Sequence, residues 1–108
     1  MTKIINCTPH TINVVVEGTE SVFPASGIIP RVSVFETEAE MLGDFPCVTT
    51  KTGAVKELPE FTEGVFLIVS GMVFAASNRT DLIAPDTGST AIRNEKGHIV
   101  AVTRFIRK

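Results

Sequence analysis

Residues 65–77 read VFLIVSGMVFAAS, and this stretch carries the strongest structural signals in the chain. Residues 65–69 are an unbroken apolar run of strand length, which predicts a central strand buried on both faces. Ser70 is a favourable N-cap residue, and the apolar residues that follow it predict a short helix over residues 71–77. The chain therefore combines one buried strand with one short helix at its centre.

Strand patterns flank this segment on both sides. Apolar and polar residues alternate with a period of two, and many of them are β-branched, which is typical of strands. The pattern predicts strands at residues 3–7, 11–17, 21–23, 31–35, 90–93 and 98–106, with a hairpin turn at residues 94–97. Residues 46–50 and 54–58 are predicted to pair across a turn at residues 51–53, and the acidic residues 37–43 to form a loop or a single turn.

These elements add up to an α+β fold, a mostly antiparallel β-sheet with one short helix. The 108 residues fit a single domain over residues 1–108, and 44% apolar with 20% charged residues is a globular composition. A domain of this size buries a thin core, which favours a homo-oligomer, a dimer or a hexamer. The net charge of -2 gives no bulk attraction to DNA, RNA or an anionic membrane, so a few placed cations must hold any anionic ligand.

Cysteine usage and apolar runs bear on the compartment. Cys7 and Cys47 lie far apart, so one disulfide is possible, but without a secretory signal two reduced cysteines are favoured. The apolar stretch at the N-terminus is too short for a signal peptide. The longest apolar run, residues 64–76, is interrupted by Ser70 and Gly71 and is too short to cross a bilayer. We therefore expect a cytoplasmic protein.

The tripeptide Asp86-Thr87-Gly88 matches the segment around the catalytic carboxylate of aspartic proteases. A pair of carboxylates sharing one proton, one from each half of a homodimer, is the chemistry that would use it. Pro85 stands where those enzymes have an apolar strand residue, and only twenty residues follow Gly88. A tight turn is therefore the favoured interpretation of this tripeptide.

Metal and cofactor motifs are absent from the sequence. His10 and His98 are isolated, and neither has a second histidine or cysteine at ligand spacing. The glycine spacing matches neither a dinucleotide fingerprint nor a phosphate loop. We expect no cofactor, no metal and no enzymatic activity.

Cations beside turn residues remain as candidates for binding an anion. Arg31 opens a predicted strand, Arg93 ends one, and Arg79 follows the predicted helix beside Asn78. Guanidinium groups suit phosphate because their donors form a fixed fork, although each arginine taken alone is more typical of a solvated strand end. The Asn78 amide suits an adenine edge, and Phe66 or Phe74 can stack on a base.

Several segments together resemble a known family. They are NCTPHTINV at residues 6–14, PASG at residues 24–27 leading to Arg31, Glu63-Gly64 before the apolar strand, and APDTG at residues 84–88 leading to Arg93. In these the chain is similar to a group of small phage proteins, the first-described Thoeris anti-defence sponges. The similarity spans nearly the whole chain.

The resemblance implies that the chain sequesters a messenger. Thoeris is a bacterial antiphage system in which a cyclic ADP-ribose isomer activates an effector, and the sponges bind this messenger tightly without degrading it. Some members are implied to hold cyclic oligonucleotides at a separate site. The implied setting is the cytoplasm of the infected bacterium. The implied ligand-binding residues are Arg31, Asn78 as the reader of the base, Arg93, and the backbone at Ala91; Phe74 is the aromatic residue that we add from its place in the helix.

Two other classes of function stay open at this point. One is a small phage enzyme, either a phosphodiesterase or an aspartic protease-like dimer that uses Asp86. The other is a phage structural or adaptor module, which would bind a protein partner and no small molecule.

Overall fold

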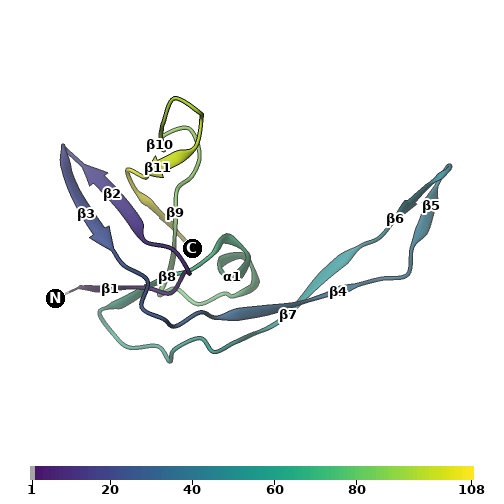
Figure 1. The fold of residues 1–108 in the computed structure, drawn as a ribbon. Helices are drawn as coiled ribbons and strands as arrows, with labels where there is room; N and C mark the ends of the chain where they lie inside the picture. The colour runs from purple at the N-terminus through teal and green to yellow at the C-terminus, as the bar shows by residue number, and fades with distance from the viewer. Residues whose placement is uncertain (1) are drawn as a thin grey trace.

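A computed structural model describes residues 2–108 as a β-rich body from which a long hairpin projects (Figure 1). It contains one short helix and mostly antiparallel strand pairs, so the predicted α+β class is confirmed. The strands are β1 (Lys3–Asn6), β2 (Ile12–Val16), β3 (Thr19–Phe23), β4 (Arg31–Glu36), β5 (Glu40–Leu42), β6 (Phe45–Cys47), β7 (Thr50–Lys56), β8 (Val65–Ile68), β9 (Leu82–Pro85), β10 (Ile92–Arg93), β11 (Ile99–Ala101) and β12 (Phe105–Arg107), and the helix is α1 (Gly71–Ala76).

The largest sheet has four strands in the order β1-β8-β9-β12. The predicted buried strand is confirmed as β8, which lies inside this sheet and contains the buried residues Leu67 and Ile68. β8 pairs in parallel with both β1 and β9, whereas β12 pairs with β9 antiparallel. Parallel neighbours need a crossover, and α1 supplies it between β8 and β9. Three strands therefore point their carboxyl ends to the same edge of the sheet.

The helix begins where the sequence predicts. Ser70 is the N-cap, and its hydroxyl accepts a hydrogen bond from the backbone N–H of Val73 at 3.4 Å. The helix ends at Ala76 because Ser77 is extended, one residue earlier than predicted. Val73 packs into the core with Cys7, Val69 and Leu82.

Two small hairpins lie beside the central sheet. β2 pairs with β3, and β10 pairs with β11 across the predicted turn, in which the Asn94 side chain accepts from the N–H groups of Lys96 and His98. The predicted continuous strand over residues 98–106 is wrong. It breaks after Ala101, because Val102 bridges to Val14 of β2 and β12 then pairs with β9.

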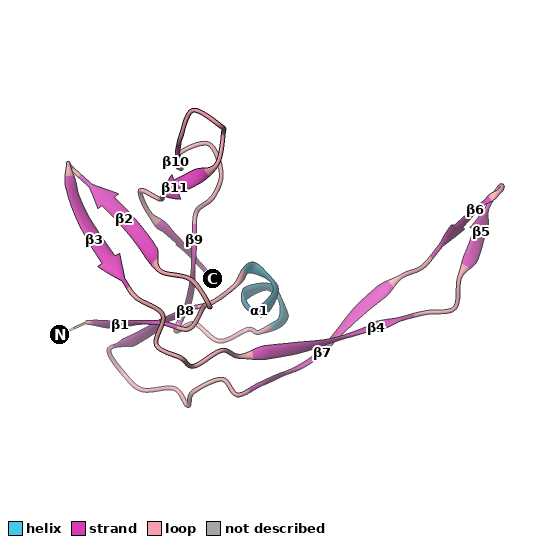
Figure 2. Ribbon diagram, viewed as in Figure 1, coloured by secondary structure: helices cyan, strands magenta, loops and turns pink. Residues whose placement is uncertain are grey.

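The projecting hairpin, which we call the arm, comprises residues 31–56 (Figure 2). β4 pairs with β7, and β5 pairs with β6 beyond them. The turn predicted at residues 51–53 is therefore wrong, since these residues lie within β7 and the chain reverses at Gly43 and Asp44 instead. Gly53 serves the strand rather than a turn: a Cβ there would lie 2.9 Å from Cε2 of the Phe35 ring. The predicted loop over residues 37–43 contains β5.

The arm makes the molecule elongated. The Cα radius of gyration is 16.8 Å, whereas a compact domain of this length has about 13 Å. The buried residues are instead concentrated around β8, β9 and α1 in the body. The body is therefore where a site for a small molecule can form.

Candidate functional site

A cleft of about 520 Å³ opens at the carboxyl edge of the three parallel strands. Its walls come from the turn after β1, the start of α1 after β8, and the segment after β9. Clefts at the carboxyl ends of parallel strands are common ligand sites, because the connecting turns meet there. The lining residues are mostly apolar with a few hydroxyl groups: Thr8, Pro9, His10, Ile12, Val69, Ser70, Gly71, Phe74, Ala84, Pro85, Thr87 and Ile106.

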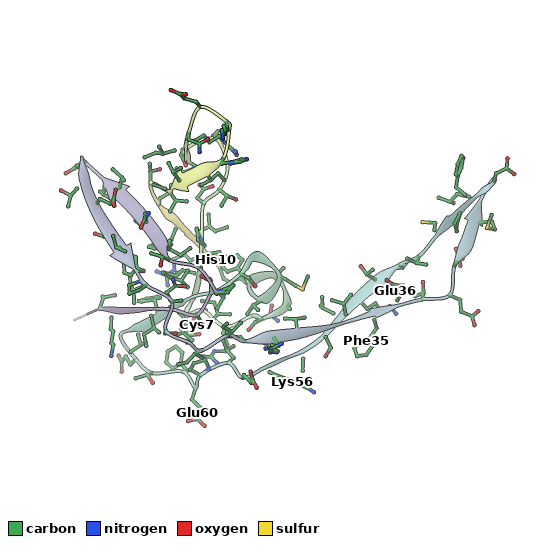
Figure 3. The ribbon with its side chains drawn as sticks, in the orientation of Figure 1. Cys7, His10, Phe35, Glu36, Lys56 and Glu60 are labelled. Atoms are coloured by element: carbon green, nitrogen blue, oxygen red, sulfur yellow. The ribbon has the colours of Figure 1, made fainter. Side chains whose placement is uncertain are left out.

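Asn6 holds the turn that forms one wall. The side chain of this buried residue donates to the carbonyls of His10, at 2.7 Å, and Phe23, at 2.8 Å. Its Oδ1 accepts from both the backbone N–H and the hydroxyl of Thr8, at 2.9 and 2.7 Å. All the hydrogen-bonding capacity of the amide is used, so the turn over residues 8–10 is fixed relative to β3. Figure 3 shows His10 at this turn, above the sheet.

Phe74 provides an aromatic surface in the cleft. Its ring is half-buried on α1, and the Lys108 ammonium lies 4.6 Å from the ring centroid. This is cation–π geometry. The aromatic wall of the cleft therefore carries a positive charge beside it.

An ion pair between Arg104 and Asp86 lies just after the end of β9. The Arg104 guanidinium donates from Nε to Oδ2 of Asp86 at 2.7 Å, and the backbone N–H of Gly88 donates to the other carboxylate oxygen at 3.0 Å. The Arg104 interaction, together with the Gly88 hydrogen bond, holds the pKa of Asp86 below its ordinary value. The side-chain-to-backbone bond two residues along the chain is that of an Asx turn, in agreement with the turn interpretation of Asp86-Thr87-Gly88.

Arg93 and Ala91 lie close to this part of the cleft. The Arg93 guanidinium donates to the carbonyl of Gly97 at 2.8 Å and lies 3.5 Å from the carbonyl of Thr87, a lining residue. The backbone N–H of Ala91 donates to the Gly88 carbonyl at 3.1 Å. Arg93 thus braces the segment that forms the wall, and the Ala91 amide closes a turn.

The other two predicted site residues lie elsewhere. Arg31 is at the base of the arm, 77% of its side chain is exposed, and its Nε lies 3.8 Å from Glu57. Asn78 is exposed beyond the C-terminus of α1, whereas the cleft lies at the N-terminus of that helix. Asn78 has no positive φ, so it does not close the helix in the left-handed conformation. Of the five predicted residues, Phe74 alone lines the cleft, and the roles of Arg31 and Asn78 stay predictions.

Arg79, the third arginine that the sequence offers as a candidate, is half-buried and held by hydrogen bonds within the protein. Its Nε donates to Asp81 at 2.9 Å and its NH1 donates to the carbonyl of Pro59 at 2.7 Å. Asp81 is buried, so this bidentate pair compensates a buried carboxylate. Arg79 therefore anchors the loop before β8 and is not free to bind an anion.

A smaller cleft of about 140 Å³ lies between β2 and β11. It shares Ile12, Pro85 and Thr87 with the larger one, so these three residues form the wall between the two. The shared wall makes the two clefts neighbours on one side of the body.

Residues 2–108 contain no candidate metal site, no membrane-spanning helix and no disulfide. No group of three or more His, Cys, Asp or Glu side chains there is arranged to hold a metal ion. No helix in this range is long and apolar enough to cross a membrane. Both cysteines are free, Cys7 in the core and Cys47 on the arm.

No family model, curated protein or solved structure matches the chain.

Sequence reasoning misses three contributors to the cleft: Asn6, Thr87 and Lys108. Thr87 lies within the Asp86-Thr87-Gly88 tripeptide, whose motif points to a role for the aspartate and to none for the threonine. Asn6 has a local signal, because an asparagine two residues before Thr8 in a Thr-Pro turn is a typical side-chain cap. Lys108 has none, since only the pairing of β12 with β9 brings it to Phe74.

Proposed function

We propose that the chain binds a cyclic nucleotide immune messenger, a cyclic ADP-ribose isomer, and sequesters it without degrading it. The observation that carries this proposal is the cleft of about 520 Å³ at the carboxyl ends of three parallel strands, with Phe74 in its wall and Lys108 beside that ring. Ligand pockets for small organic molecules range over about 300–1,000 Å³, so the volume suits a molecule of this class.

The lining supports a base-containing ligand. The apolar residues Val69, Pro85 and Ile106 line the cleft together with Phe74. Stacking of a nucleobase on an aromatic ring contributes roughly 1–3 kcal/mol and needs no hydrogen-bond code. The hydroxyl groups of Thr8, Ser70 and Thr87 add donors around this apolar floor.

The cations around the cleft support an anionic ligand. Lys108 lies against Phe74 and Arg93 contacts the Thr87 carbonyl, whereas the charge of Arg104 is already balanced by Asp86. A pyrophosphate bridge carries two negative charges, and charge-assisted hydrogen bonds to it contribute about 1.5–3 kcal/mol each. A chain of net charge -2 can hold such a ligand through these local cations.

Sequestration of the messenger is the biological role that the resemblance to Thoeris anti-defence sponges implies. A phage protein that removes the messenger from the cytoplasm of the infected host blocks antiphage signalling without any turnover. Slow dissociation is what this role demands, and burial of the ligand provides it.

The test is stoichiometric binding of an intact ligand. Protein from cells without a messenger synthase is titrated with cyclic ADP-ribose isomers, with cyclic oligonucleotides and with linear ADP-ribose, and binding is followed by calorimetry and thermal shift. A ligand at a hundred times its dissociation constant stabilises the fold by about 2.7 kcal/mol. Heating the complex should then release the same nucleotide unchanged.

Variants locate the ligand. Phe74→Ala should weaken binding by roughly 1–3 kcal/mol, and Lys108→Ala by about 1.5–3 kcal/mol. The matched controls are Phe61→Ala, at an exposed phenylalanine outside the lining, and Lys3→Ala, at the opposite end of β1. If Arg31→Ala and Asn78→Ala abolish binding while the two cleft variants bind like wild type, the ligand lies elsewhere and the cleft assignment is wrong.

The competing functions give different results in the same experiment. Disappearance of excess ligand with time would identify a phosphodiesterase. Absence of binding to every nucleotide in the panel would defeat the proposal and leave a structural or adaptor module.

A further inference from the structure

Gly71 is the one glycine among residues 2–108 whose lack of a side chain the fold does not explain. Two of the eight glycines lie against a neighbouring side chain: a Cβ at Gly53 would lie 2.9 Å from the Phe35 ring, and one at Gly88 would lie 3.1 Å from Oδ1 of Asp86. Five others have a positive φ, which favours glycine: Gly18, Gly27, Gly43, Gly64 and Gly97.

The backbone at Gly71 suits any residue. Its φ is not positive, and it is the first residue of α1. Outside the adjoining residues and the backbone of the helix itself, a Cβ there would meet no heavy atom within 4 Å. Glycine in a helix is less favourable than alanine, because its backbone loses more conformational freedom on folding. A position where the fold would tolerate a side chain and lacks one points to a reason outside folding.

The empty space at Gly71 belongs to the cleft. Gly71 and Phe74 both line it, and they are three residues apart on α1, so they lie on the same side of the helix. Of the residues between them, Met72 is exposed and Val73 is buried in the core. Helical side chains lean toward the helix N-terminus, so the Phe74 ring extends from its own turn toward Gly71. The ring and the Gly71 backbone therefore lie next to each other along one wall.

The direction toward Gly71 is open, whereas other sides of the Phe74 ring are covered. The ring packs against the core cluster of the body, and the Lys108 ammonium lies 4.6 Å from the ring centroid. The lysine stem is flexible and can move aside for a base, but the core cannot. Room for a group wider than the phenyl ring therefore remains at the start of α1, where Gly71 has no side chain.

We propose that Gly71 determines which bases the cleft accepts, by leaving room for the second ring of a purine. A purine has two fused rings, so it overhangs the single ring of Phe74 when it stacks there. One ring of the purine stacks on Phe74 and the other lies over the Gly71 backbone, where a Cβ would obstruct it. A pyrimidine fits on Phe74 alone and gains nothing from this space. This inference rests on the proposed binding of a nucleotide in the cleft.

The first test adds carbon atoms at Gly71. Gly71→Ala should weaken the binding of cyclic ADP-ribose isomers by about tenfold or more, and Gly71→Leu should abolish it, because the added atoms fill space that the base needs. Both variants should stay folded, and Gly71→Ala should unfold at a higher urea concentration than wild type. Ala75→Leu is the matched control and should bind like wild type, since Ala75 is exposed on the same helix outside the lining.

The second test separates purine selectivity from a general loss of binding. ADP-ribose and UDP-ribose differ only in the base, so their comparison isolates the effect of the second ring. The wild-type chain should bind ADP-ribose about tenfold or more tightly than UDP-ribose. In Gly71→Ala the ratio of the two affinities should fall toward one, because the purine loses its place while the pyrimidine keeps its contact with Phe74. A change that merely disturbed the fold would weaken both probes alike.

The outcomes distinguish this inference from the proposed function. If the wild-type chain binds no purine nucleotide, the proposed function fails and the role of Gly71 fails with it. If the wild-type chain and a folded Gly71→Leu variant bind cyclic ADP-ribose isomers equally well, the proposed function stands and the role of Gly71 is overturned. A wild-type chain that does not discriminate between ADP-ribose and UDP-ribose overturns it too, as does an equal weakening of both probes in Gly71→Ala.

Discussion

Asn6 shows how a single buried amide can position a site in which it takes no direct part. It does not line the cleft, yet it bonds to both ends of the turn that does, at Thr8 and His10, and its own carbonyl accepts from the N–H and hydroxyl of Ser26. The residue thereby ties β1 to β3 and to the loop before the arm. Its role depends on partners up to twenty residues away, so the sequence signal around Thr8 reveals only part of it.

Replacing Asn6 by alanine should destabilise the fold by about 2–3 kcal/mol. The hydroxyl and N–H of Thr8, together with the carbonyls of His10 and Phe23, would lose their buried partner, and unmet buried groups cost about 1–3 kcal/mol. Urea unfolding measures the difference. Asn78→Ala is the matched control, because an exposed surface substitution changes stability within about 0.5 kcal/mol. Equal effects of the two variants would contradict the structural role of Asn6.

The Asp86 carboxylate should give the fold an acid-sensitive contribution. Arg104 and the Gly88 N–H hold the pKa of Asp86 below its ordinary value in the folded state. The ionised form is therefore favoured by folding, so its contribution is complete above the ordinary aspartate pKa of about 3.9 and is lost as pH falls through the lowered folded value. We expect the difference in unfolding free energy between wild type and Asp86→Asn to be constant near neutral pH and to shrink in acid. A difference that grows in acid would contradict this sign.

At the scale of elements, local sequence patterns predict a strand or a helix start where neighbouring residues alone determine it. The strand β8 and the N-cap of α1 follow from an apolar run and from Ser70, and both are where the sequence places them. The arm is different. Gly53 carries the local signature of a turn, but it lies within β7, beneath the Phe35 ring, because β4 and β7 pair along most of their length.

The cleft depends on pairing that no local pattern contains. β1 and β8 are parallel neighbours about sixty residues apart in sequence, and their pairing brings the turn at His10 to the start of α1. Phe74 is the one predicted site residue that this pairing carries into the lining. Guanidinium chemistry alone makes the arginines candidates and says nothing about their partners, and Arg79 pairs with Asp81 in the structure.

A substitution in β8 tests how much the central sheet contributes. Ile68 is 0% exposed and lies between β1 and β9. Ile68→Ala should cost about 2–5 kcal/mol in unfolding free energy, because it leaves a cavity where the backbone of a sheet cannot collapse. Ile28→Ala, at an exposed isoleucine in the loop before the arm, should cost less than about 1 kcal/mol. Urea unfolding of both variants gives the comparison.

At the scale of the whole molecule, the body and the arm differ in what they contain. The buried residues, the central sheet and both clefts between strands belong to the body, whereas the arm contributes Val32 and Val55, at its base, to the core. The elongated shape is thus an addition to a folded body rather than a consequence of how that body packs. The two parts should then respond separately to change.

Removal of the distal arm should leave a compact and folded body. Residues 38–48 make no contribution to the core, and Thr37 and Thr49 are hydrogen-bonded at the point where the arm would be closed by Asn-Gly. Small-angle scattering of this shortened chain, with Asn-Gly in place of residues 38–48, should give a radius of gyration below the 16.8 Å of one full chain and closer to the value of about 13 Å for a compact domain of this length. Nucleotide binding by the shortened chain should equal that of the full chain, because none of the removed residues lines the cleft. A shortened chain that unfolds, or that loses binding while folded, would show that the arm supports the body after all.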